Sequence, residues 1–118
     1  MARKADHVVL ICSRCRGEEQ AATMRDTLAP CLPSSYAIRL VPCMAGCASP
    51  PTVGFQAAGK AQYLFGTIAS SADVAAIAAF AQQYEGSADG WTTAAERPRA
   101  LFAKTLARIP AVCSGAAT

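Results

Sequence analysis

The stretch HVVLICSRCRG, residues 7–17, decides the fold. It opens with a run of apolar, β-branched residues over 7–11, which predicts a short buried strand. The strand runs directly into a Cys-x-x-Cys pair, Cys12 and Cys15, and Glu18 to Leu28 then has the spacing of an amphipathic helix. A strand followed by a helix predicts a crossover to a second strand that lies parallel to the first.

Three further strands and two further helical stretches are expected downstream. The strands are expected at 36–41, 52–56 and 61–65. The last two strands flank a turn at Gly59, so they are expected to pair antiparallel. A helix capped by Ser70 or Ser71 is expected to run to about Tyr84. Another helical stretch is expected from Arg97 to about Arg108.

These elements predict one α/β domain over residues 1–118, because a chain of 118 residues fits a single core. The expected architecture is a thioredoxin-like mixed four-stranded sheet flanked by helices. Its core spans about residues 7–84, and a C-terminal helical arm spans about 85–112. Hydrophobic residues make up 53% of the chain and charged residues 16%, which excludes a disordered chain.

Charge and hydropathy exclude two classes of partner. Eleven Lys and Arg against eight Asp and Glu give a formal net charge of +3, without the clustered basic residues of a nucleic-acid binder. No apolar stretch approaches the ~20 residues of a membrane span. The apolar run near the N-terminus is shorter than that of a secretory signal, so we expect a cytoplasmic protein. Cysteine-rich cytoplasmic chains more often bind metal or catalyse than form disulfides.

Four of the six cysteines form two local pairs, and each pair follows a predicted strand. Cys12 and Cys15 follow the first strand, and Cys43 and Cys47 follow the second. Because parallel strands end at the same edge of a sheet, the four thiols are expected to converge there. Four thiolates suit either a structural zinc ion or an iron–sulfur cluster.

The remaining cysteines and the single histidine are expected to be structural. Cys31 and Cys113 are expected to pack as small buried hydrophobes, although Cys31 is also an alternative ligand in place of Cys15. His7 is expected to be a strand-edge residue, and one histidine excludes a Rieske centre, which needs two.

The second half of the predicted core resembles a known fold. The segment PTVGF (51–55), the turn at Gly59-Lys60 and the Ser-capped helix with Asp73 resemble the second half of a thioredoxin-like fold. With a Cys-x3-Cys loop just before Pro50-Pro51, residues 7–84 resemble the thioredoxin-like 2Fe-2S ferredoxins. That resemblance implies a 2Fe-2S cluster held by two cysteines after the first strand and two in the Cys-x3-Cys loop.

By motif matching, the implied cluster ligands are Cys12, Cys15, Cys43 and Cys47. The ferredoxins usually separate their first two ligands by a longer loop than the two residues between Cys12 and Cys15. The related ferredoxins pair, so the resemblance also allows a homodimer.

Nearly the whole chain resembles a second group, a family of small bacterial proteins described as predicted metal-binding and otherwise of unknown function. The matching features are YLFG, DGW (89–91), RP (97–98) and KTLARIP (104–110).

The expected function is ferredoxin-like electron transfer, or an accessory role in metal or cofactor metabolism. We expect an electron carrier rather than an enzyme with its own substrate pocket. Two alternatives stay open: a structural zinc protein, and a thioredoxin-like dithiol oxidoreductase that uses Cys12 and Cys15.

Charged residues near the proposed centre and in the arm bear on potential and partners. Arg14 and Arg16 would offset the negative charge of a thiolate-ligated cluster. A basic C-terminal arm is either a solvated face or a docking surface for an acidic redox partner; it comprises Arg97, Arg99, Lys104 and Arg108.

Overall fold

A computed structural model of the chain describes residues 6–13, 17–42, 51–93 and 96–110. The elements follow in the order β1 (His7–Cys12), α1 (Glu18–Leu28), the short 3-10 helix η1 (Ala29–Cys31), β2 (Tyr36–Val41), β3 (Val53–Ala57), β4 (Gln62–Phe65), α2 (Ser71–Gly86), the 3-10 helix η2 (Arg99–Lys104) and β5 (Thr105–Ile109).

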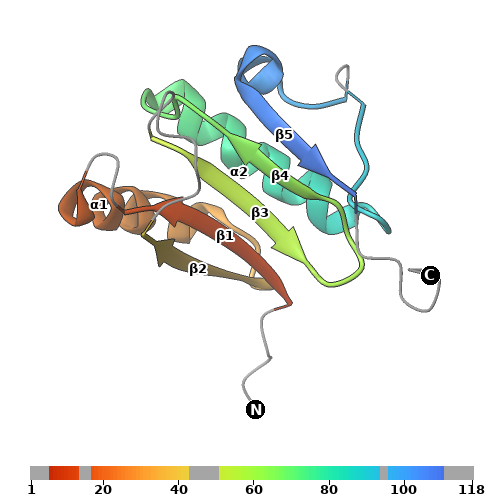
Figure 1. Ribbon diagram of the computed structural model, residues 1–118, viewed down its shortest axis with the longest axis horizontal. Coiled ribbons are helices and arrows are strands. Elements are labelled where there is room, and N and C mark those ends of the chain that lie inside the picture. Colours follow the sequence, from red (N-terminus) through yellow and green to blue (C-terminus); the bar gives the residue numbers. More distant parts are fainter. Residues whose placement is uncertain (1–5, 14–16, 43–50, 94–95, 111–118) are drawn as a thin grey trace.

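The strands form one five-stranded mixed sheet in the order β2-β1-β3-β4-β5 (Figure 1). β1 and β2 are parallel, with His7 opposite Tyr36 and Cys12 opposite Val41. The other neighbouring pairs are antiparallel, including the β3–β4 hairpin that turns at Gly59. These findings confirm the α/β class, the parallel crossover and the antiparallel hairpin.

Two expectations for the C-terminal part are wrong: the described residues form a sheet of five strands rather than four, and beyond α2 they contain a short 3-10 helix and a strand in place of the expected helical arm. Residues 99–104 form a 3-10 helix, and Thr105–Ile109 form β5. β5 pairs with β4, where Arg108 lies opposite Tyr63. Without β5, the outer backbone groups of β4 would be an open sheet edge. The expected helical stretch therefore ends at Lys104, because residues 105–109 pair with β4 instead of continuing it.

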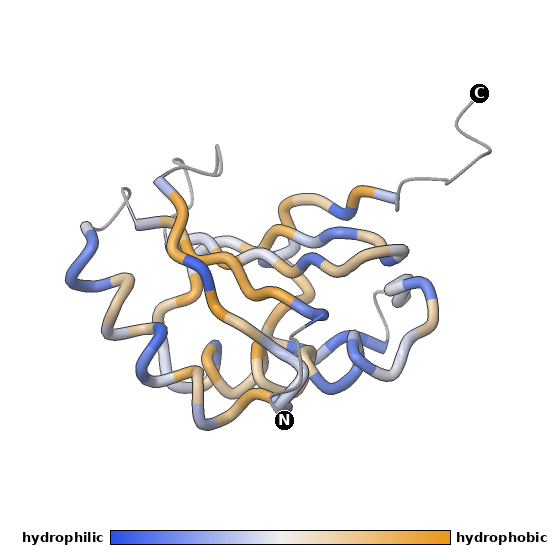
Figure 2. Tube along the Cα trace, turned by 90° about the horizontal axis from the view of Figure 1, so that it is seen from below, coloured by the Kyte–Doolittle hydropathy of each residue, from blue (hydrophilic) through white to orange (hydrophobic). Residues whose placement is uncertain are grey.

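One face of the sheet carries the core, and both α-helices cover that face. Val9 is paired with Ile38 on one side and Phe55 on the other, so these three side chains share a face. Leu28 of α1 and Phe80 of α2 belong to the same buried cluster. Figure 2 accordingly shows the helices along one side of the strands. No helix in the described part of the chain is long and apolar enough to cross a membrane.

The centre of this core is aromatic. The ring centroid of Phe80 lies 4.9 Å from those of both Phe55 and Tyr63, with the rings nearly perpendicular in each pair. Phe65 and Tyr84 complete the cluster, and every member is 3% exposed or less. Such edge-to-face pairs add about 1 kcal/mol beyond the burial of their area.

The start of α2 is held by a capping box. The Ser70 hydroxyl accepts from the backbone N–H of Asp73, and the Asp73 carboxylate accepts from the N–H of Ser70. This confirms the predicted serine cap. Lys104 then donates to Asp73 Oδ2 and to the carbonyl oxygen of Thr67, each at 2.8 Å. Burial of Asp73 disfavours its charged form, but the hydrogen bonds from Lys104 and from the backbone outweigh it and hold its pKa at about 2.

Candidate metal centre

Cys12 is the last residue of β1, and its side chain is buried at the edge where the parallel strands end. The residue is 3% exposed and lies opposite Val41 in the β1–β2 ladder. Its Sγ lies 3.8 Å from the carbonyl oxygen of Pro42. The next residue, Ser13, donates its N–H to the Val41 carbonyl oxygen at 2.7 Å and its hydroxyl to the same oxygen at 3.0 Å. The first predicted ligand is thus fixed to the end of β2.

Cys12 also contacts the residue with which the chain returns to the sheet. Its backbone N–H donates to the carbonyl oxygen of Thr52 at 3.2 Å. Cys12 therefore contacts two residues that flank the segment carrying Cys43 and Cys47 in the sequence. Pro42 precedes that segment, and Thr52 follows it. Parallel pairing on one side of β1 and antiparallel pairing on the other bring these two chain positions together.

Three of the four predicted ligands lie outside the described residues: Cys15, Cys43 and Cys47. Arg14 and Arg16, predicted to offset cluster charge, lie there as well. The convergence of the four thiols therefore stays a prediction. Within the described ranges, no group of three His, Cys, Asp or Glu residues could hold a metal ion, so this part of the molecule offers no competing metal site.

Cys31 follows α1 and is exposed, with its Sγ 3.7 Å from the Thr27 carbonyl oxygen. Five residues separate β1 from α1, and the 11 residues of α1 carry the chain about 16 Å along the helix axis. This placement argues against Cys31 as a replacement for Cys15. It also shows that Cys31 is not the buried hydrophobe expected from the sequence. Cys113 lies outside the described residues.

Thr52 is a candidate site residue that sequence reasoning missed. It is fully buried, and its Oγ1 finds no hydrogen-bond partner among the described residues. The Cys12–Thr52 backbone bond continues the β1–β3 register, and paired side chains in such a ladder share a face with Cβ atoms about 5 Å apart. A buried hydroxyl without a partner is costly, and this one lies beside a predicted thiolate ligand. The sequence does contain one signal for Thr52, because this residue closely follows the predicted ligand loop that carries Cys43 and Cys47.

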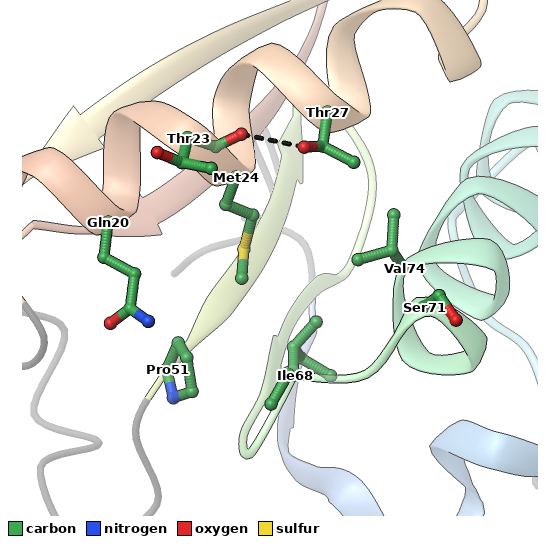
Figure 3. A pocket seen from close by; sticks show the side chains of 9 residues that line it. Gln20, Thr23, Met24, Thr27, Pro51, Ile68, Ser71 and Val74 are labelled. Carbon is green, nitrogen blue, oxygen red and sulfur yellow. Dashed lines mark hydrogen bonds between the residues drawn. The ribbon is translucent and has the colours of Figure 1, made fainter.

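A groove of about 370 Å³ opens between α1 and the start of α2 (Figure 3). Met24, Ile68 and Val74 give it apolar walls, and Pro51 brings one wall to the chain that enters β3. Gln20 supplies an amide at the rim. Among the described residues that line the groove there is no cysteine, histidine or acid. Its polar side chains are the Gln20 amide and the hydroxyls of Thr23, Thr27 and Ser71.

His7 lies at the opposite end of β1 from Cys12 and has a structural role. It is 7% exposed, its Nδ1 lies 2.7 Å from Asp6 Oδ1, and its Nε2 lies 2.8 Å from Lys60 Nζ. Lys60 also donates to the carbonyl oxygen of Tyr84 at 2.6 Å, at the C-terminal end of α2. Burial lowers the pKa of Lys60, and the carboxylates of Asp6 and Glu85 oppose that shift. The ring thus joins β1 to the hairpin and α2.

Comparison with known proteins places the chain in a family. Residues 9–111 match the family model described as a protein of unknown function, DUF1636. The chain belongs to the DUF1636 family. No curated protein and no solved structure gives a significant match to this DUF1636 chain. Membership confirms the expected relationship to a family of unknown function, while metal binding and the likeness to 2Fe-2S ferredoxins stay predictions.

Proposed function

We propose that this DUF1636 protein binds a 2Fe-2S cluster through Cys12, Cys15, Cys43 and Cys47. It would act as a ferredoxin-like electron carrier or as an accessory protein in metal or cofactor metabolism. The observation that carries the proposal is the contact of Cys12 Sγ with the carbonyl oxygen of Pro42. Cys43 is the next residue in the chain, and consecutive Cα atoms are about 3.8 Å apart. The Cα atom of Cys43 is therefore one residue step from that of Pro42, the residue that Cys12 contacts.

The residues around Cys12 fit a thiolate-ligated centre. Its sulfur is nearly excluded from water, which favours a bound cluster over an exposed, oxidisable thiol. The Thr52 hydroxyl is a buried donor without a described partner, and Thr52 directly precedes β3, the strand that pairs with β1. Hydrogen bonds to the sulfurs of a cluster stabilise its reduced, more negative state and so raise its potential.

A bound cluster supplies one-electron chemistry, and the chain supplies position and environment. Cys12 is held within regular backbone pairing, since its N–H bonds to Thr52 and the following N–H bonds to Val41. A ligand on a strand end is placed more rigidly than one on a free loop, which limits reorganisation when the charge of the centre changes. The same edge fixes both ends of the segment that carries the second cysteine pair.

The topology supports a thioredoxin-like arrangement with an added strand. A parallel β-α-β unit is followed by an antiparallel hairpin and a helix, and these two halves share one core. β5 extends the sheet beyond the four strands that this arrangement needs. We propose the thioredoxin-like relationship on this pattern together with the positions of the two cysteine pairs.

Dithiol exchange is favoured less than cluster binding. A thiol that attacks a substrate disulfide has to be reached by it, yet Cys12 is 3% exposed. α1 carries Glu18 and Glu19 in its first turn, and their negative charge offsets the positive helix end that would stabilise a neighbouring thiolate. A structural zinc ion would use the same four cysteines, so metal analysis has to distinguish a zinc site from a 2Fe-2S cluster.

The deciding experiment is anaerobic purification of the full chain, followed by its visible spectrum and by iron, sulfide and zinc analysis. The proposal predicts brown protein whose visible absorbance is bleached by dithionite. Colourless protein with about one zinc per chain would replace the cluster with a structural site. Metal-free protein that reduces insulin disulfides would replace it with dithiol exchange.

A further inference from the structure

The large hydrophobic side chains that are exposed in the described part of the chain all lie in or beside β5. Trp91 is 46% exposed, Phe102 62%, Leu106 43% and Ile109 54%. Scattered exposed hydrophobes need no explanation, but Trp91, Phe102 and Leu106 line one groove, and several on one surface are typical of an interaction site. Aromatic residues and arginine are also the residue types enriched in protein interfaces.

Two arginines on this surface have no acidic partner among the described residues. Arg97 Nη1 and Arg108 Nη1 donate to the same carbonyl oxygen, that of Thr92, at 2.9 and 2.7 Å. The Arg108 guanidinium also lies 3.6 Å from the ring centroid of Trp91. No described carboxylate lies within ion-pair distance of either guanidinium. Two like charges held around one oxygen create a positive potential that favours an incoming carboxylate.

Beside these residues, β5 has an edge with which no described strand pairs. It is the last strand in the sheet order, and β4 is its only strand neighbour among the described residues. A groove of about 620 Å³ adjoins it, with Trp91, Arg97, Phe102 and Arg108 among its lining residues. An edge strand with open backbone groups is a template for an additional strand.

We propose that the β5 edge binds an extended, acidic segment of a partner protein, which pairs with β5 as a sixth strand. Backbone hydrogen bonds to β5 would supply affinity that does not depend on sequence. Alternate side chains of the segment would supply specificity, with carboxylates at Arg97 and Arg108 and apolar groups at Phe102 and Leu106. This surface is three strands from β1, about 14 Å across the sheet, so the inference holds whether or not the cysteines bind metal.

Charge selects an acidic partner over a second copy of this chain. Pairing of β5 with β5 of another copy would bring two sets of Arg97 and Arg108 to one interface. Each chain also carries a formal net charge of +3. Like charges across an interface cost several kcal/mol, whereas complementary charges speed association.

The test uses two short, capped, fluorescein-labelled peptides: one alternates glutamate with valine, and the other has lysine at each glutamate position. Fluorescence anisotropy with the full chain should show saturable binding of the glutamate peptide, weaker at higher salt. The lysine peptide should bind at least about tenfold more weakly. On binding, amide chemical shifts should change in β5 and residues 91–93. Equal binding of both peptides would overturn the proposal.

Variants locate the binding surface. The double variant Arg97→Gln, Arg108→Gln should weaken binding of the glutamate peptide at least about tenfold. Arg39→Gln is the matched control, because Arg39 is exposed on β2, the opposite edge strand, and should leave binding unchanged. Phe102→Ser removes an exposed side chain without opening the core and should also weaken binding.

Two results would contradict the assignment. One is an equal loss of binding in Arg39→Gln and in the double variant. The other is a concentration-dependent dimer that is abolished by Phe102→Ser and competes with the peptide, since that would assign the edge to a second copy of the chain.

Discussion

The sulfur of Cys12 lies 3.8 Å from the carbonyl oxygen of Pro42, although 30 positions separate the two residues in the sequence. The contact follows from parallel pairing of β1 and β2, which ends both strands at one edge of the sheet. In the sequence, Cys15 follows Cys12 closely and Cys43 follows Pro42 directly, so the described residues that precede both of these cysteines meet at this edge. The proposed metal centre depends on this relationship.

Replacing Thr52 with valine should not destabilise the metal-free protein. Its buried hydroxyl lacks a described partner, so Thr52→Val removes an unsatisfied polar group and should raise the free energy of unfolding by up to about 1 kcal/mol. Urea denaturation of the metal-free chain measures this difference. In metal-loaded protein, the same change should lower the midpoint potential, because a donor to sulfur is lost.

Thr92→Val is the matched control for Thr52. Thr92 is also buried, but its hydroxyl bonds to the Tyr63 hydroxyl at 2.9 Å and to Arg97 at 3.2 Å. Its loss should destabilise the protein by about 1–3 kcal/mol. Equal destabilisation by both substitutions would mean that the Thr52 hydroxyl is satisfied in solution, and it would remove that hydroxyl from the account.

Gly90→Ala should destabilise the protein more than Gly59→Ala. Both glycines have φ of +74°, a conformation that costs an alanine about 1–2 kcal/mol. At Gly59 a Cβ would meet open space, whereas at Gly90 it would lie 2.9 Å from the Ala61 nitrogen and from Tyr84 Cε1. Thermal unfolding of the two variants should show the larger loss for Gly90→Ala. A smaller loss there would show that residues 87–93 do not pack against the hairpin as described.

Acid should remove a stabilising contribution that depends on Asp73. The folded-state pKa of Asp73, about 2, is below its ordinary value of 3.8, so its charged form stabilises the fold above pH 4. That contribution, at most about 2 kcal/mol, is lost as the pH falls from about 4 to 2. Asp73→Asn should therefore lower stability at pH 7 and flatten its dependence on pH in this window.

Asp26→Asn is the control for this acid-dependent term. Asp26 forms an exposed pair with Arg25, and exposed pairs contribute between about 0 and 1 kcal/mol. Its stability profile between pH 2 and 7 should follow that of the unmodified protein. An identical profile for Asp73→Asn would show that the Lys104–Asp73 pair does not stabilise the start of α2.

The first two-thirds of the fold could be predicted because local signals agree with tertiary packing there. The β-branched run of β1, the alternation of β2 and the serine cap of α2 each specify an element within a few residues. β5 could not be predicted in this way. Its formation depends on the open edge of β4, some 40 residues earlier in the chain, and the preceding helical pattern indicates another structure.

The candidate centre also has features that the sequence predicts and features that it does not. Cys12 could be placed at a sheet edge, because strand ends and parallel pairing follow from the pattern of elements. Thr52 and the Arg108–Trp91 stack could not, because an unsatisfied hydroxyl and a ring contact depend on how distant segments pack. Sequence spacing identifies candidate ligands, whereas burial and register identify the groups around them.

The central claim is tested most directly by the iron and acid-labile sulfide content of anaerobically prepared protein in two serine variants. Cys43→Ser should lose most of the about two irons and two sulfides expected per chain. Cys31→Ser, which changes an exposed cysteine beyond the far end of α1, should keep them. Equal contents in the two variants, or no iron in the unmodified protein, would contradict the account.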